Sequence, residues 1–430
     1  MKKKRFKKKR KGQKVIQPSK NIEIQQTKSK IQKPKPKIFI EEENVLANDS
    51  DSINTLKEGF YGEEKGEKLL LNSLEALYLM IIRTVPCYHN DKPVGFSYVM
   101  EMFKNEPRFF SRYNVFRDWR DRGIIIQFPE RMELKNFGRS PSIRYPSGEF
   151  KLTEMDTEKI NISYLPEDMV SFVDDVEIGK QLFEQFWFGQ LGIYKQQHRD
   201  NILKLDFIET LFLAKQGFSV KNVQTGESLS FEMLLEMLKE KRPDISALFD
   251  VYEDWRSHGY IIKTGFKFGT HFRIYFPGAS PVREKTEWIH SKHVIHVFPK
   301  DAKMIMSEWA RAVRVAHSVK KTFIMAIPGM TEDDYKEQQG KIDFIGFHRK
   351  KIGIEKPDTD NPKFAIISFT EDEELGGKQL ASALSKADEL GLRLMIGISD
   401  RETAVTYYIA KRIELHGSRN KYYEVEWIQP

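Results

Sequence analysis

The clearest structural pattern in the chain lies in Gly259-Tyr-Ile-Ile-Lys-Thr-Gly-Phe-Lys-Phe-Gly-Thr-His-Phe-Arg-Ile-Tyr275. Apolar and polar residues alternate along it on both sides of Gly265 and Gly269, as expected when one face of a strand is buried and the other faces water. Glycines between two alternating runs are typical of a turn. The pattern therefore predicts a twisted antiparallel β-hairpin.

Two helical patterns precede this hairpin, and each occurs twice in the chain. Ser73–Leu79 matches Phe207–Leu213 at an offset of 134, and Tyr113–Gly123 matches Phe249–Gly259 at an offset of 136. The apolar residues follow the i, i+3, i+4 spacing of amphipathic helices, and a glycine closes each second segment. The sequence thus predicts two copies of one small helical unit.

A β–α–β unit is also duplicated, at the C-terminal end. Phe298–Ile327 aligns without a gap with Phe369–Ile398 at an offset of 71, and the strands before them, His293–Phe298 and Phe364–Phe369, match as well. Each copy reads as strand, turn, amphipathic helix and apolar strand. The two duplications together indicate a chain built from copies of two modules.

These patterns predict an α+β fold of repeated small units, each with a helical N-terminal module, a mixed β-sheet module with a packed helix, or both. We expect a basic disordered tail over 1–54 and an N-terminal helical unit with a degenerate β remnant over 58–178. A catalytic unit is expected over 179–352, and a C-terminal pseudo-catalytic β-unit over 353–430.

The basic charge of the chain is concentrated at its N-terminus. Residues 1–38 contain 16 Lys or Arg and one acidic residue, whereas the other 392 residues contain 54 basic and 61 acidic ones. Lysine-rich tails are common in nucleic-acid-binding proteins, because each phosphate contact releases a counterion. A solubilising or targeting tail is an equally good interpretation, and neither specifies a reaction.

Composition excludes several classes of protein. No run of 18 apolar residues is present, so a membrane span is not expected. The N-terminus has no apolar core of a secretory signal. The single cysteine, Cys87, excludes an intramolecular disulfide framework and a cysteine-clustered zinc or iron–sulfur site. We expect a cytoplasmic protein in a reducing compartment.

Candidate catalytic residues lie at the ends of the expected elements. Tyr275 ends a strand, His290 opens the next one, and Lys321 ends a helix expected over 307–321. Together they could supply a base, an acid and a cation for RNA cleavage without a metal ion. The same residue types are also common at such ends in proteins without catalytic function. His293 and His296 alternate along a strand, so we expect no three-histidine metal site.

At these residues the chain resembles archaeal tRNA-splicing endonucleases. The resemblance is dense over 205–327, recurs over 60–123 and is weaker over 360–412; it rests on Gly259–Tyr275, His290-Ser291, His296–Pro299 and Arg314–Lys321. It implies a substrate, precursor tRNA with a bulge-helix-bulge structure, and an assembly, a homodimer of the three-unit fused-chain type. It implies no cofactor and no metal ion.

The resemblance also implies a role for each site residue. Tyr275 is the general base, His290 the general acid, and Lys321 the cation that stabilises the transition state. Arg314 corresponds to one of two arginines that stack on either side of a flipped bulge base. No residue of this sequence is assigned to the second arginine. The products are a 2′,3′-cyclic phosphate and a 5′-hydroxyl.

The C-terminal copy lacks this set, because Leu392 aligns with Lys321. Its turn carries four consecutive acidic residues, Glu371, Asp372, Glu373 and Glu374. In the family an acidic loop docks into a basic pocket of a neighbouring unit, so the turn is a candidate dimer loop. A solvated turn is the plain alternative, and Leu165–Asp168 is a competing candidate.

Two other functions stay open at this point. The chain could be a non-catalytic structural or RNA-binding subunit of such an endonuclease that needs a partner chain for activity. It could also be a binding protein whose basic tail alone carries the affinity for RNA. The presence of Tyr275, His290 and Lys321 together favours an active enzyme.

Overall fold

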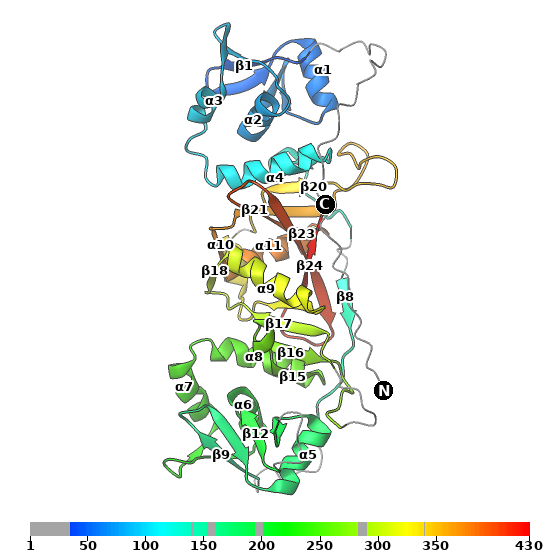
Figure 1. Cartoon of the computed structure of the whole chain (residues 1–430). Coiled ribbons are helices and arrows are strands. Elements are labelled where there is room, and N and C mark those ends of the chain that lie inside the picture. Colours follow the sequence, from blue (N-terminus) through cyan, green and yellow to red (C-terminus); the bar gives the residue numbers. More distant parts are fainter. Residues whose placement is uncertain (1–34, 139–141, 153–159, 194–200, 283–289, 339) are drawn as a thin grey trace, which may run out of the picture.

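The computed structural model describes residues 35–138, 142–152, 160–193, 201–282, 290–338 and 340–430. The chain forms an elongated molecule, with one helical module at each end and a large sheet between them (Figure 1). Helices and sheets are mixed throughout, which confirms the α+β class.

The first module combines helices with a six-stranded sheet of order β3-β4-β2-β1-β5-β6. Its elements are β1 (Ile38–Glu41), β2 (Asn44–Ala47), α1 (Ser50–Glu58), β3 (Glu63–Lys65), β4 (Lys68–Leu71), α2 (Ser73–Ile81), β5 (Cys87–His89), β6 (Lys92–Val94), α3 (Phe96–Met102) and α4 (Phe109–Asp121). Helices α2 and α4 confirm the helices expected in the first copy.

The expected tail was too long, because two strands and most of a helix lie within 1–54. Ile38 and Ile40 of β1 are buried, and β1 pairs with both β2 and β5. The alternation in these four-residue strands is too short to stand out beside the lysine- and proline-containing segment before it. Residues 1–34 lie outside the described residues.

The second module repeats the first one, with the sheet order β11-β12-β10-β9-β13-β14. Its elements are β9 (Asn161–Leu165), β10 (Val170–Val173), α5 (Val176–Phe186), β11 (Gln190–Leu191), β12 (Leu203–Asp206), α6 (Phe207–Lys215), β13 (Ser219–Asn222), β14 (Ser228–Leu229), α7 (Phe231–Lys241) and α8 (Ile245–Ser257). The boundary expected between 178 and 179 was wrong, since it falls inside α5 of this module.

The β-units form one sheet of order β15-β16-β17-β19-β25-β24-β23-β21-β20-β7, with β8 on β24. Its strands are β7 (Ile126–Gln127), β8 (Ser142–Tyr145), β15 (Ile261–Thr264), β16 (Phe272–Tyr275), β17 (His293–Val297), β19 (Thr322–Ala326), β20 (Phe344–Gly346), β21 (Phe364–Thr370), β23 (Arg393–Ser399), β24 (Val405–Leu415) and β25 (Tyr422–Ile428). Strands β15 and β16 confirm the hairpin. Strand β8, part of the expected β remnant, pairs with the C-terminal unit instead of forming a hairpin.

The two β-units join where β19 pairs with β25, so that Phe323 lies opposite Val425. Strand β20 belongs to the second of these units, because it pairs with β21, so that unit begins before the expected residue 353. Helices α9 (Met306–Ser318), α10 (Glu332–Gln338) and α11 (Gly377–Glu389) accompany the sheet, with a small ribbon of β18 (Lys303–Ile305) and β22 (Glu374–Gly376). The described residues also include the 3₁₀ turns Pro129–Arg131 and Phe266–Phe268.

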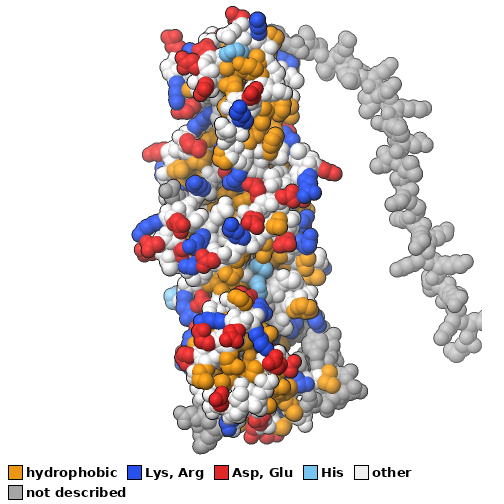
Figure 2. All heavy atoms as spheres, turned by 90° about the vertical axis from the view of Figure 1, so that its left-hand side faces the viewer, with side chains coloured by type: hydrophobic (Ala, Val, Ile, Leu, Met, Phe, Trp, Pro, Cys, Tyr) orange, Lys and Arg blue, Asp and Glu red, His pale blue; other side chains and the backbone are white. Residues whose placement is uncertain are grey.

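Figure 2 shows the face that carries α10 and β18, with acidic and basic side chains interspersed over its middle. In the described part of the chain, no helix combines the length and apolar character that a bilayer crossing requires. The core of the second module is continuous with strands β15, β16 and β17, which fixes that module against the strands that carry the candidate site.

Candidate active site

Three neighbouring strands end at the same place, and the predicted catalytic residues lie there. Strand β16 ends with Tyr275 and pairs with β17, which begins at His293. His293 lies opposite Thr322, the first residue of β19, which follows Lys321. The strand register thus brings Tyr275 and Lys321 to one end of the β16–β17–β19 layer, beside the segment that contains His290.

The amine of Lys321 is tied to the residue that follows His290. Its Nζ donates to the carbonyl oxygen of Ser291 and, over 3.0 Å, to the Ser291 Oγ, and it lies 4.5 Å from the centre of the Phe268 ring. Burial and, to a smaller extent, the charge of Arg273 lower the pKa of Lys321. Two oxygen acceptors and a ring therefore hold this amine in a defined position.

Lys321 reaches this position through a turn and not through the end of a helix. Helix α9 ends at Ser318, earlier than expected, and Lys320 then adopts a left-handed backbone conformation with φ of 55°. The Lys321 N–H donates to the Ala316 carbonyl at 3.0 Å. The turn redirects the chain into β19 and places Lys321 at the strand's beginning.

Tyr275 is buried at the end of β16 and is 6% exposed. The ring of Trp187, from the second module, lies over it with a centroid distance of 4.6 Å and an interplanar angle of 36°. The guanidinium of Arg273 lies 5.9 Å from the centre of the Tyr275 ring. An aromatic ring and a cation are thus both close to the candidate base.

His290 is exposed and immediately follows residues 283–289, which lie outside the described residues. It precedes β17 and does not open it as expected, since the strand begins at His293. Its neighbour Ser291 is buried and bound by Lys321, so the backbone at 291 is anchored. An exposed imidazole next to an anchored residue is accessible to a large substrate.

The other histidines of this region lie in the sheet and stay neutral at pH 7. Burial, followed by repulsion from Lys292 and Lys321, lowers the pKa of His293 to about 4. Burial lowers the pKa of His296 to about 3. Among the described residues there is no group of three His, Cys, Asp or Glu side chains that could hold a metal ion.

Arg314 is exposed on α9, and its Nε donates to the Ala310 carbonyl of the same helix at 3.3 Å. The helix preceding Lys321 therefore presents an accessible guanidinium. A planar cation in such a position can stack on an unpaired base.

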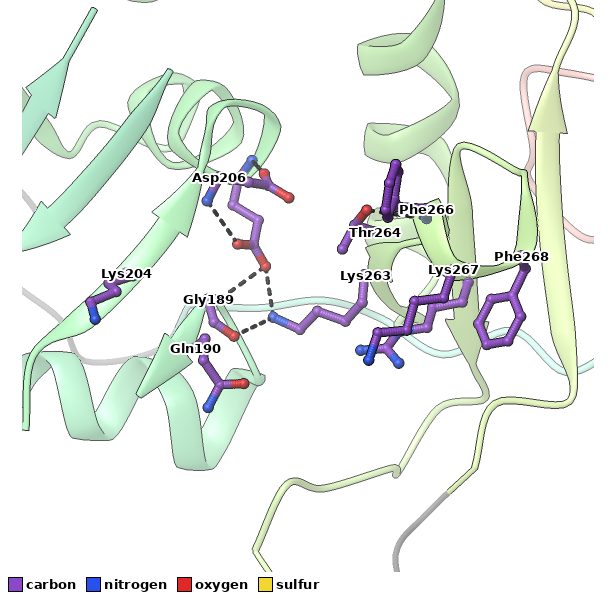
Figure 3. A pocket seen from close by; sticks show the side chains of 11 residues that line it. Gly189, Gln190, Lys204, Asp206, Lys263, Thr264, Phe266, Lys267 and Phe268 are labelled. Carbon is purple, nitrogen blue, oxygen red and sulfur yellow. Dashed lines mark hydrogen bonds and ion pairs between the residues drawn. The ribbon is translucent and has the colours of Figure 1, made fainter. Parts of the chain in front are cut away.

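A cavity of about 420 Å³ opens beside the site, between the second module and the β15–β16 hairpin. The aromatic rings of Phe266 and Phe268 line it, together with two acidic and four basic side chains: Asp206, Glu209, Lys204, Lys263, Lys267 and Arg273. Basic side chains exceed acidic ones, so we call it the cationic cavity. Figure 3 shows the Lys263 side chain extending from the hairpin toward the second module, where it pairs with Glu209 of α6. Lys263, Lys267 and Arg273 lie in the predicted hairpin, but the sequence pattern did not predict a cavity there.

A buried ion pair joins the two walls of this cavity. The Nζ of Lys263 lies 2.7 Å from Glu209 Oε1, and both side chains are less than 10% exposed. Burial and the charge of Glu209 raise the pKa of the neighbouring Asp206 to about 7. In the first module the residue that corresponds to Glu209 is Glu75, which pairs with Arg131 at 2.7 Å. The recurrence of this glutamate in the two helical repeats was the signal that could have revealed it.

The acidic turn of the C-terminal copy forms ion pairs within its own chain. Glu373 accepts from Arg108 Nε at 3.0 Å, and Asp372 lies 3.0 Å from Arg401. Asp372 and Glu374 remain about 60% exposed. The competing segment Leu165–Asp168 lies at the turn between β9 and β10, where Glu167 pairs with Lys241 at 3.4 Å.

The C-terminal copy places an apolar residue where the catalytic unit has its lysine. Leu392 is 2% exposed and directly precedes β23, as Lys321 precedes β19. Asp388, which aligns with His317, lies 3.3 Å from the Tyr423 hydroxyl and 3.5 Å from Arg412. The segment leading into β23 thus contains a buried leucine where the catalytic unit carries Lys321, and an aspartate bound to neighbouring side chains.

Comparisons with known proteins agree with this architecture. Residues 245–337 match the family described as tRNA intron endonuclease, catalytic C-terminal domain, and residues 37–100 and 163–235 match its N-terminal domain. Strands β1 and β2 and most of the second module, as far as the first part of α7, therefore fall within recognised N-terminal domains, whereas α8 falls within the match to the catalytic domain.

Proteins named tRNA-splicing endonuclease are similar to the chain. The one from Methanococcoides burtonii is 27% identical over 352 residues, which cover 68% of this chain and 93% of that protein. The one from Methanopyrus kandleri is 35% identical over 152 residues, 35% of this chain and 78% of that protein. The one from Pyrococcus abyssi is 32% identical over 190 residues, 44% of this chain and 99% of that protein.

Proposed function

The chain belongs to the tRNA intron endonuclease family, and on that premise we propose that it is a tRNA-splicing endonuclease. It cleaves precursor tRNA at bulge-helix-bulge intron boundaries by metal-independent transesterification. The observation that carries the proposal is the meeting of Tyr275 and Lys321 at one strand end, next to the segment of His290. The matching end of the C-terminal copy has Leu392 instead.

In the proposed reaction Tyr275 acts as its phenolate: it takes the proton of the 2′-hydroxyl next to the scissile phosphate, and the 2′-oxygen attacks phosphorus. His290 donates a proton to the departing 5′-oxygen. The P–O5′ bond breaks as the P–O2′ bond forms, which leaves a 2′,3′-cyclic phosphate and a 5′-hydroxyl. Each positioned acid or base typically contributes about 10²–10⁴ to such a rate.

Lys321 acts in this scheme as a fixed cation for the negative charge that develops on the phosphoryl oxygens. Its tether to Ser291 supports the role, because preorganised charges cost no reorganisation when the reaction occurs. Arg273, near both Lys321 and the Tyr275 ring, adds positive charge to the same place. Arg314 supplies a guanidinium for a splayed bulge base, since RNA of this kind is recognised mainly by shape and unstacked bases.

We propose a homodimer, because one set of Tyr275, His290 and Lys321 per chain must cut an intron at two ends. Each chain then contributes two N-terminal modules, one catalytic unit and one C-terminal copy without the catalytic set. Complementary charge supports docking of the acidic turn of one protomer in the cationic cavity of its partner. Asp372 and Glu374 are the exposed carboxylates available for it.

The experiment that tests the proposal is cleavage by the purified chain alone in EDTA. The substrate is a bulge-helix-bulge RNA, and the control is the same RNA with both bulges closed by pairing. Cyclic phosphate and 5′-hydroxyl ends at the bulges would establish a self-sufficient, metal-independent endonuclease. Tight binding without cleavage would support the alternative of a structural or RNA-binding subunit, and cleavage that requires Mg²⁺ would overturn the assigned roles.

A further inference from the structure

A strained aromatic residue of the second module lies directly on the candidate base. Trp187 follows the last residue of α5 and adopts a left-handed conformation with φ of 53° and ψ of 40°. A bulky side chain rarely takes this conformation, which costs on the order of 1–3 kcal/mol and persists only where surrounding contacts enforce it. Its N–H caps α5 by bonding to the Leu182 and Phe183 carbonyls.

Arg256 of α8 contacts the residues on both sides of Trp187. Its guanidinium donates to the carbonyl oxygens of Phe186 and Tyr260 and lies 4.1 Å from the centre of the Phe188 ring. Arg256 is 1% exposed, so these contacts are made away from water. The residues on both sides of Trp187 are therefore fixed to α8, the helix that leads into β15.

A residue of the catalytic unit also contacts this segment, at Gly189. Lys263 of β15 donates to the Gly189 carbonyl at 2.8 Å, and the Gly189 N–H donates to Glu209 at 2.9 Å. Gly189 has φ of 57°, and a Cβ atom there would collide with the Lys204 carbonyl. The aromatic loop, residues 186–189, is thus clamped between the module and the β15–β16 hairpin that carries Tyr275.

We propose that Trp187 is a positioning residue for the cleavage reaction: its ring holds the Tyr275 ring in the orientation needed to accept the 2′-hydroxyl proton. The short ring-to-ring distance, the enforced backbone of Trp187 and the burial of Tyr275 carry the proposal. It rests on the proposed function of Tyr275 as general base. The helical module then takes part in catalysis by orienting a side chain of the catalytic unit.

The first module contains the same loop without a catalytic residue under it. Phe60 occupies the position of Trp187, with φ of 57°. Arg120 donates to the Gly59 carbonyl and lies 3.8 Å from the Tyr61 ring, as Arg256 does in the second copy. Phe60 packs against the core cluster to which α9 and α11 contribute. It is therefore a matched control for the loss of an aromatic ring at an equally strained position.

The experiment compares Trp187→Ala, Trp187→Phe and Phe60→Ala by single-turnover cleavage, RNA affinity and thermal unfolding. We expect Trp187→Ala to lower the cleavage rate about 10- to 100-fold, because a displacement of about 1 Å in a reacting group costs this much. RNA affinity should change less than about twofold, and Trp187→Phe should restore most of the rate. Phe60→Ala should lower the unfolding temperature similarly and leave the rate unchanged.

A double-mutant cycle separates positioning from a general loss of structure. If Trp187 acts through Tyr275, Trp187→Ala should cause no further loss of rate in the Tyr275→Phe background. Equal losses of rate in Trp187→Ala and Phe60→Ala, or additive losses in the cycle, would overturn the inference. An unchanged rate in Tyr275→Phe alone would instead overturn the proposed role of Tyr275, which keeps the two failures distinct.

Discussion

The amine of Lys321 lies 3.0 Å from the Oγ of Ser291, 30 residues earlier in the chain. This contact joins the start of β19 to the segment just before β17, and therefore joins two of the three candidate catalytic residues. Because Ser291 is buried, the backbone after His290 is fixed although the His290 side chain is exposed. The exposed His290 and the partly buried Lys321 amine therefore share one support, Ser291.

Removal of the Lys321 amine should slow the chemical step and leave RNA binding intact. We expect Lys321→Ala to reduce the single-turnover rate by about 10²-fold or more, since one fixed charge at the reacting phosphate typically contributes that much. Lys320→Ala removes the exposed neighbouring cation and should leave the rate within about twofold. A Lys321→Ala enzyme as fast as the unmodified one would exclude the proposed role.

Arg314 should contribute to the affinity for bulged RNA only. Arg314→Ala is expected to raise the Kd for bulge-helix-bulge RNA about fivefold, corresponding to a cation–π contact of about 1 kcal/mol. The Kd for the fully paired control RNA should not change. Arg311→Ala, another exposed arginine of α9, is the matched control, and equal effects of the two variants on both RNAs would reduce Arg314 to a nonspecific cation.

Neutralisation of Asp372 and Glu374 should weaken the homodimer. The double variant Asp372→Asn/Glu374→Gln leaves the Arg108–Glu373 ion pair intact but removes the Asp372–Arg401 and Glu374–Lys303 ion pairs. Arg401→Ala, which breaks the Asp372 pair and keeps both acidic side chains, is therefore the control that separates docking from the fold of the turn. We expect the dimer Kd, measured by sedimentation velocity, to rise about tenfold or more as cavity lysines lose their partners. If Glu167→Gln/Asp168→Asn has this effect instead, the turn between β9 and β10 is the docking element.

Stability should fall as pH rises from about 4 to about 7, because of Asp206. Its pKa in the folded protein is about 7, above the ordinary 3.8, so the folded state binds more protons than the unfolded state in this window. Asp206→Asn should flatten the dependence of the unfolding temperature on pH. The first module already uses Asn72 at the corresponding cap of α2, so the helix cap survives the change.

The control for this pH effect is Asp175→Asn, which changes the exposed N-cap of α5. It should leave the slope of stability against pH unchanged between 4 and 7. Asp206→Asn with an unaltered slope would show that the buried carboxyl does not titrate in this window.

Deletion of residues 1–34 should weaken the electrostatic part of RNA binding and leave the cleavage positions unchanged. This segment contains 14 lysines and arginines and one glutamate, and the cut ends before the buried Ile38 of β1. Each lost phosphate contact should reduce the salt slope of log K by about 0.7–0.9. Loss of all RNA binding would instead favour the interpretation of the chain as a tail-driven binding protein.

Local periodicity was sufficient to predict the helical repeats and the β15–β16 hairpin. Strands β15 and β16 form the predicted hairpin, and α2 and α6 form where helices were predicted. The expected amphipathic face was wrong for both helices, because Ser73–Leu79 and Ile208–Leu213 are buried on all sides. The short strands β1 and β2 were missed, because four residues of alternation carry little signal beside a charged tail. Trp187 was missed because its contact with Tyr275 joins residues 88 positions apart.

Repeats, short-range periodicity and motif identity are properties of neighbouring residues. They were enough to predict the module composition, the family resemblance and the candidate residues Tyr275, His290 and Lys321. The pairing of β19 with β25 into one sheet, the Lys263–Glu209 ion pair between module and hairpin, and the contact of Trp187 with Tyr275 join segments that are far apart in the sequence. These segments meet because folding buries apolar surface between them, and no local pattern encodes which distant segments will meet.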